Sequence, residues 1–219
     1  MSIVLHHFWR SSASWRVRWA LELKQLPWTS RAVDIVKGEH QALDFVGVRS
    51  PISHVPCLEI DGRALTESVA ILEWLEETHP TPAIYPRDPW VRARCRQLVE
   101  LMNAGTQPLQ NLVVLDAISR EPGPRGEWAA RWIARGLTAF EHALATIERE
   151  GGAPASGPHA LGATVTAADI FLVPQLPNAR RFGVDMRAFP RVCAVEAAAL
   201  ATEACASTAP EKWQPASST

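Results

Sequence analysis

The sequence predicts an α/β domain over residues 1–80, a linker over 81–89 and an all-helical domain over 90–219. Two observations support this fold class. Strand-like and helix-like segments alternate in the first part, whereas no convincing strand follows residue 90. Between the two parts lies a proline-rich stretch of the kind found in linkers, with Pro80, Pro82, Pro86 and Pro89.

The N-terminal part begins with a predicted strand over residues 2–7 and a predicted helix over 11–25. We expect Ser11 or Ser12 to cap this helix, because serine accepts hydrogen bonds from first-turn N–H groups. The helix is apolar on two sides, which predicts that other elements sandwich it. A strand candidate over 28–35 follows, and then a polar stretch with a short helix.

A hairpin is predicted next, with strands over 54–60 and 63–65 joined by Asp61 and Gly62, a preferred two-residue turn. A helix over 67–78 follows, and the His79-Pro80 pair ends it. The order strand, helix, strand, short helix, strand, strand, helix fits a small α/β unit with a mixed sheet.

The C-terminal part is predicted to be helical. Thr166 and Asp169 form a capping-box-like helix start, and the tail from Lys212 onward is expected to fray. Long helical segments are predicted over residues 91–119, 127–150 and 189–206, with a loop rich in Gly, Pro and Ser over 151–162.

Composition narrows the function classes. A formal net charge of -1 argues against nucleic acid or an anionic membrane as partner, and no apolar run is long enough for a membrane span or a signal peptide. The cysteines form no C-x-x-C pair and no cluster at zinc spacing, so we expect no metal site and no catalytic thiol. Scattered thiols favour a reducing cytoplasm; they are Cys57, Cys95, Cys193 and Cys205.

The turn between the first strand and the first helix carries serines and no cysteine. A helix N-terminus offers free N–H groups and the positive end of a dipole, which favour an anion such as a thiolate. A free thiol has a pKa of about 8.5, and lowering it by about two units takes roughly 2.7 kcal/mol. One interpretation is therefore that Ser11 and the helix stabilise a thiolate supplied by a ligand. The alternative is that Ser11 and Ser12 only cap the helix.

Two other pairs of residues suggest ligand contacts. Pro56 directly precedes a strand, which raises the chance of a cis bond after Val55 that exposes a backbone edge. Glu67 and Ser68 start a helix, where N–H groups would hold a ligand carboxylate. The alternative for Glu67 and Ser68 is a simple capping pair.

Longer blocks carry a more specific signal. Residues 11–21 read SSASWRVRWAL. From residue 3 to about residue 215 the chain resembles the zeta class of glutathione transferases, which includes the maleylacetoacetate and maleylpyruvate isomerases and has the motif S-S-C-x-W-R-V-R-x-A-L. Further matching blocks are VPCLEIDG, ESVAILEWLEETHPTPAIYP, QPLQNLVVL (107–115), TAADIFLVPQ (166–175) and NARRFGVD (178–185).

The resemblance implies a thioredoxin-like glutathione-binding domain, a helical domain that supplies most of the second-substrate pocket, and a homodimer. Ser11 aligns with the residue that hydrogen-bonds the glutathione sulfur, with Ser12 nearby. Val55 aligns with the position whose backbone pairs with the cysteinyl part of glutathione. Residues that align with other glutathione contacts of the family are Gln41, Pro56, Glu67, Ser68, Gln107 and Asn111.

The implied activity is glutathione-dependent cis–trans isomerisation of a maleyl-type keto acid, by thiolate addition, rotation and elimination. Arg10 and Arg181 stand where the family places arginines for the substrate carboxylates and the developing enolate. Their alternative is a surface salt bridge. Arg16 and Arg18 look structural, linking the first helix to the second domain.

The chain departs from the family at two places. Ala13 replaces the motif cysteine, and residues 111–113 (NLV) lack the basic residues of the maleylpyruvate type. A second hypothesis is therefore a transferase that conjugates or dehalogenates a small electrophile, which needs neither Arg10 nor Arg181. A third is a non-catalytic binding protein, against which the retained site residues speak. A thioredoxin-type disulfide reductase is excluded, because the turn has no thiol.

Overall fold

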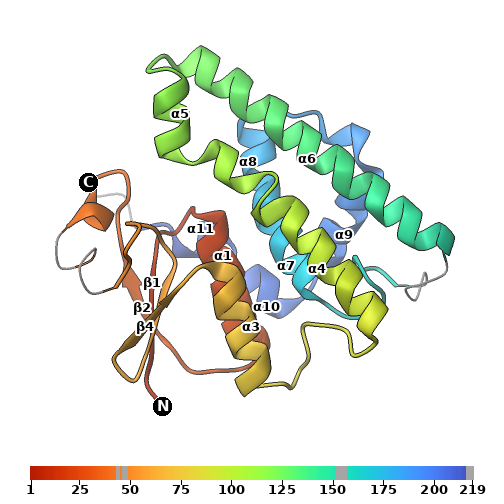
Figure 1. Ribbon diagram of the computed structural model, residues 1–219, viewed down its shortest axis with the longest axis horizontal. Coiled ribbons are helices and arrows are strands. Elements are labelled where there is room, and N and C mark those ends of the chain that lie inside the picture. The colour runs from red at the N-terminus through yellow and green to blue at the C-terminus, as the bar shows by residue number, and fades with distance from the viewer. Residues whose placement is uncertain (43–44, 46–48, 151–156, 216–219) are drawn as a thin grey trace. The chain divides into compact units, whose positions relative to one another are not determined.

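The structure, a computed structural model, describes residues 1–42, 45, 49–150 and 157–215 (Figure 1). The chain forms two units, one of Met1–Ala83 with Thr202–Thr219 and the other of Ile84–Ala201. The C-terminal segment therefore belongs to the first unit, which differs from the helical domain predicted over 90–219. Its helix α10 (Glu203–Thr208) packs against α1 (Ser12–Leu23).

The first unit contains a four-stranded sheet in the order β2-β1-β3-β4. Strand β2 runs parallel to β1, and β3 and β4 are antiparallel to their neighbours, so the predicted mixed sheet is confirmed. Asp61 and Gly62 have φ of 46° and 80°, because a type I′ hairpin turn requires positive φ at both central residues. The strands are β1 (Ile3–His7), β2 (Thr29–Ala32), β3 (Cys57–Ile60) and β4 (Arg63–Thr66).

Helices α1 and α3 (Ser68–Thr78) lie side by side against the sheet (Figure 1). All residues of α1 from 15 to 21 are buried, two arginines included, which confirms that the helix is sandwiched. The predicted short helix in the polar stretch appears as the 3-10 turn η1 (Glu39–Gln41), and part of that stretch lies outside the described residues.

The last predicted helix, over 189–206, is wrong in detail, because α9 (Pro190–Leu200) ends before α10 begins. Thr202 starts the new helix, since its side chain accepts a hydrogen bond from the Cys205 N–H. The expected fraying of the tail is wrong for Lys212 and Trp213, which belong to α11 (Pro210–Trp213). Residues 216–219 of the tail lie outside the described residues.

The second unit is helical, and among its described residues the only β-type pairing is an isolated bridge between His159 and Gly162. The continuous helix predicted over 91–119 is wrong, because Thr106 leaves the helical conformation with φ -131°. Thr106 also lies against Gly136 of α6, where an added Cβ would come within 1.9 Å of the threonine Oγ1. The elements are α4 (Pro89–Asn103), η2 (Gln107–Gln110), α5 (Leu112–Ile118), α6 (Pro122–Glu150), α7 (Ala167–Leu172), η3 (Val173–Gln175), α8 (Leu176–Arg181), η4 (Met186–Ala188) and α9.

The capping box at the start of α7 is confirmed. Thr166 donates to the Asp169 carboxylate through its N–H at 2.8 Å and its hydroxyl at 2.9 Å. Part of the loop predicted over 151–162 lies outside the described residues. In the described ranges, no helix has the length and apolar character needed to cross a membrane.

Candidate active site

Three predicted site segments leave the same end of the sheet. His6 of β1 pairs with Cys57 of β3, and Cys57 pairs with Thr66 of β4. The turn after β1, the loop before β3 and the start of α3 after β4 therefore lie together. This register brings Ser11, Val55 and Ser68 to one region, although they are far apart in the sequence.

Ser11 is the N-cap of α1. Its Oγ accepts a hydrogen bond from the Ser14 N–H at 3.2 Å, and its own N–H donates to the Phe8 carbonyl at 3.1 Å. A hydroxyl has one proton and two lone pairs, so the cap bond leaves the Ser11 proton available for a ligand. Ser12 follows as the first helical residue and is buried.

Arg10 lies exposed beside this turn. Its guanidinium stands 5.9 Å from the ring centre of Phe8 and 5.5 Å from that of Trp9. Within the part of the chain that the structure describes, no acidic group pairs with Arg10, so the surface salt bridge that was its alternative is not formed there.

The loop before β3 contains a cis peptide bond between Val55 and Pro56, as the sequence suggested. Val55 packs against a small apolar cluster that includes Val33 and Phe45. Its own N–H and C=O make no hydrogen bond to any other described residue, so they are available to an extended ligand.

The start of α3 has an unusual backbone. Glu67 has φ 68° and ψ 112°, a conformation that non-glycine residues rarely adopt and that clusters at functional sites. Ser68 is buried, and its Oγ accepts a hydrogen bond from Arg16 Nη1 at 3.1 Å. The helix dipole and this arginine make the start of α3 favourable for a carboxylate.

Arg16 and Arg18 reach two different parts of this region from α1. Arg16 contacts Ser68, whereas Arg18 donates to the carbonyls of the turn that precedes Ser11. The sequence interpretation treated both as structural and missed these contacts. Two arginines in a helix that the sequence predicts to be sandwiched were the available signal, since buried charge is rare without a specific role.

The other predicted site residues belong to other elements. Gln41 is exposed at the end of η1. In the second unit, Gln107 donates to the Asn111 side-chain oxygen at 2.7 Å. Arg181 is exposed at the end of α8, with its guanidinium 4.6 Å from the ring centre of Phe182.

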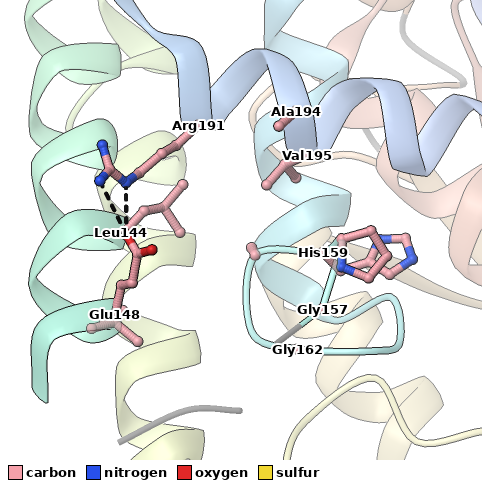
Figure 2. A pocket seen from close by; sticks show the side chains of 11 residues that line it. Leu144, Glu148, Gly157, His159, Gly162, Arg191, Ala194 and Val195 are labelled. Atoms are coloured by element: carbon pink, nitrogen blue, oxygen red, sulfur yellow. Dashed lines mark hydrogen bonds and ion pairs between the residues drawn. The ribbon is translucent and has the colours of Figure 1, made fainter. Parts of the chain in front are cut away.

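The helical unit also holds a shallow pocket of about 280 Å³ between α6, α9 and residues 157–162 (Figure 2). Arg191 and Glu148 form an ion pair at 3.0 Å on its rim. None of the predicted site residues lines it.

The cysteines are all free, and none resembles a nucleophile. Burial raises the pKa of Cys57 to about 11 and that of Cys95 to about 12, so both stay protonated at neutral pH. In the described ranges, no group of histidine, cysteine or acidic side chains could hold a metal ion.

A thioredoxin-like unit with a serine at the first helix N-terminus, followed in the chain by a helical unit, defines a glutathione transferase. The family "Glutathione S-transferase, N-terminal domain" matches residues 5–83, and "Glutathione S-transferase, C-terminal domain" matches residues 130–195. Probable maleylacetoacetate isomerase 2 of Drosophila melanogaster is 42% identical over 195 residues, which are 88% of this chain and 81% of that protein.

Solved structures agree with the sequence comparison. A bacterial maleylpyruvate isomerase of the zeta class superposes with a TM-score of 0.91 at 37% identity, covering 98% of this chain and 100% of the other. Maleylacetoacetate isomerase from Anaeromyxobacter dehalogenans with bound glutathione gives 0.83 at 46% identity, covering 98% and 97%. The chain belongs to the zeta class of the glutathione S-transferase family.

Proposed function

We propose that this protein is a glutathione-dependent cis–trans isomerase of a maleyl-type keto acid, maleylacetoacetate or maleylpyruvate. The observation that carries the proposal is the sheet register that collects the N-terminus of α1, the backbone of Val55 and the N-terminus of α3. The similarity to maleylacetoacetate and maleylpyruvate isomerases over most of the chain supports the substrate class.

The residues at this end of the sheet fit glutathione chemically. The α-carboxylate of its γ-glutamyl group matches the N-terminus of α3, where Arg16 supports Ser68. The amide groups of its cysteinyl residue match the N–H and C=O of Val55 beside Pro56, which make no hydrogen bond to the described residues. Its sulfur matches the N-terminus of α1 with Ser11 and Ser12. Glu67 supplies a carboxylate for the γ-glutamyl ammonium.

When bound, glutathione supplies the nucleophilic sulfur that adds to the substrate double bond and leaves after rotation. Ser11 donates its hydroxyl proton in a hydrogen bond to the sulfur, which stabilises the ionised thiol. The positive end of α1 acts in the same direction. The N–H of Ser12 is one of the first-turn N–H groups of α1 that favour an anion. The turn therefore needs no thiol of its own, because its groups stabilise the thiolate of the ligand.

We assign the substrate carboxylates to Arg10 and Arg181. Guanidinium groups bind carboxylates through paired hydrogen bonds and remain charged at all working pH values. Both side chains are exposed, and Arg10 is held against the turn by the rings of Phe8 and Trp9. Further contacts to glutathione are assigned to Gln41, Gln107 and Asn111.

A second candidate is a transferase that conjugates or dehalogenates a small electrophile. It is favoured by residues 111–113, which carry no arginine, and by the exposed apolar side chains of Leu112 and Val113. The retained arginines favour the isomerase, because an uncharged electrophile requires none. We further propose that the protein is cytoplasmic, in accordance with its free cysteines, and that it works as a homodimer, as the resemblance to its family implies.

The deciding experiment is an assay on maleylacetone and maleylpyruvate with and without glutathione. The isomerase predicts conversion to the trans isomer that requires glutathione but does not consume it. Consumption of glutathione with an electrophile, without isomerisation, would favour the transferase. No binding of glutathione by calorimetry would overturn both.

A further inference from the structure

Arg18 is buried in α1 without an acidic partner among the described residues. Its Nε donates to the Thr208 carbonyl at 3.1 Å, and its Nη2 donates to the Trp9 carbonyl at 3.1 Å. Its Nη1 lies 3.1 Å from His7 Nδ1 and 3.5 Å from the Phe8 carbonyl oxygen. Because an isolated buried charge is costly, these carbonyl groups are what holds the guanidinium in the interior.

His7 is the titratable group in contact with Arg18 among the described residues. A guanidinium only donates, so Nδ1 of His7 accepts, and Nε2–H donates to Ser30 Oγ at 2.8 Å. Burial, and then the charge of Arg18, lowers the pKa of His7 to about 3. Burial also lowers the pKa of Arg18 to about 9. At neutral pH the histidine is therefore neutral and the arginine charged.

The last described helix, α11, places the ring of Trp213 against Arg18 and His7. The ring of Trp213 from α11 lies 5.6 Å from the Arg18 guanidinium carbon, within cation–π range. It stacks on Trp28 at 5.1 Å with an interplanar angle of 22°, and it meets His7 edge-on at 5.3 Å. The Trp213 ring therefore contacts both Arg18 and His7, and it shields the guanidinium from water.

Arg18 and Ser11 share an acceptor. The Phe8 carbonyl receives the Ser11 N–H at 3.1 Å and lies 3.5 Å from Arg18 Nη1. The next carbonyl, of Trp9, is also held by Arg18. Two carbonyls of the turn that ends at Ser11 are thus fixed by one buried side chain.

We infer that Arg18 is a positioning residue for Ser11 and that Trp213 keeps it in place, so that the C-terminal helix α11 helps the turn to ionise a bound thiol. This inference rests on the proposed function. Without the indole, water reaches the guanidinium and competes for its hydrogen bonds. The turn then relaxes, and the Ser11 hydroxyl is less well directed.

The test is Trp213→Leu, with Trp213→Phe as the conservative variant. The thiol pKa of bound glutathione is titrated by the ultraviolet absorbance of the thiolate, and the Kd is measured by calorimetry. We expect the thiol pKa of glutathione bound to Trp213→Leu to be about 0.5 higher, which corresponds to about a threefold smaller ionisation constant of the thiol. Its Kd at acidic pH should stay within about twofold, since Val55 and Ser68 are untouched. In Trp213→Phe the thiol pKa of bound glutathione should return to near the wild-type value.

Trp90→Leu is the matched control, because Trp90 also stacks on an arginine, with Arg94 at 5.1 Å, but belongs to the other unit. An unchanged thiol pKa in Trp213→Leu, or an equal rise in Trp90→Leu, would overturn the inference and leave the proposed function standing. Wild-type protein that binds no glutathione, or does not lower its thiol pKa, would overturn both.

Discussion

Replacing Ser11 tests two roles, the N-cap that the structure shows and the proposed hydrogen bond to the sulfur of glutathione. Ser11→Ala removes the N-cap oxygen that accepts from the Ser14 N–H at 3.2 Å. Loss of such a cap typically costs about 1 kcal/mol of unfolding free energy. For a chain of 219 residues this lowers the melting temperature by roughly 2–4 °C.

Ser11→Ala also removes the hydroxyl that we propose as the donor to the bound sulfur. A hydrogen bond to a charged group contributes about 1.5–3 kcal/mol, which corresponds to about 1–2 pKa units. The α1 dipole remains and contributes roughly 0.3–1 kcal/mol, less than one unit. The pKa of the thiol of bound glutathione should therefore rise to near its free value of about 8.5.

Ser11→Gly distinguishes these effects, because glycine costs only a few tenths of a kcal/mol at an N-cap but has no hydroxyl. Both variants should raise the thiol pKa equally, and only Ser11→Ala should lower the melting temperature appreciably. Ser14→Ala is the control. Its Oγ is buried without a hydrogen-bond partner among the described residues, and its backbone N–H still completes the cap.

The assay is the pH–rate profile of isomerisation together with thiolate absorbance of bound glutathione. A profile of Ser11→Gly that superposes on that of the wild type would refute the role of the hydroxyl. A shift in Ser14→Ala as large as that in Ser11→Ala would show that the effect comes from helix stability instead.

Three other changes have defined outcomes. The buried ammonium of Lys24 donates to Glu76 at 3.0 Å and to the carbonyls of His79 and Pro82, so Lys24→Met should cost about 3–5 kcal/mol in urea unfolding. Combining it with Glu76→Leu should recover only part of the loss, because the two carbonyls stay unpaired, and additive losses would contradict the pairing. Arg181→Ala should reduce kcat/KM for a keto diacid at least about tenfold (about 1.4 kcal/mol) but leave an uncharged electrophile nearly unaffected; equal losses would remove Arg181 from substrate binding. Burial depresses the pKa of His7 from 6.5 to about 3, so the unfolded state binds more protons between these values and stability falls as the pH drops through that window. His7→Asn should flatten this slope between pH ~7 and ~5, measured by urea unfolding, and a parallel slope would exclude His7 as its source.

Local patterns in the sequence were sufficient for much of the first unit. The Asp61-Gly62 turn and the Ser11 cap depend on a few neighbouring residues, and both appear as predicted. The site segments could be named separately for the same reason. Their meeting at one end of the sheet depends on strand register, which the resemblance implied and local pattern alone did not.

The misjudged elements are those whose ends depend on distant partners. The tail was expected to fray because nothing near Trp213 in the sequence holds it, whereas its ring stacks on Trp28. The break at Thr106 is hidden for the same reason, since the facing residue is Gly136 of another helix. Periodicity reports which face of a helix is apolar, but not where a second helix interrupts it.

Ala13 brings the sequence and the structure together at the turn. The cap bond runs from the Ser14 N–H to Ser11 Oγ and does not involve residue 13. Alanine is also the most favourable residue in a helix, so replacing the motif cysteine leaves the local geometry of Ser11 intact. Burial keeps Cys57 and Cys95 protonated. Under the proposed function, the reacting sulfur therefore comes from the ligand, and we expect the protein to contribute Ser11, the N-terminus of α1 and Arg18, which contacts the carbonyls of the turn.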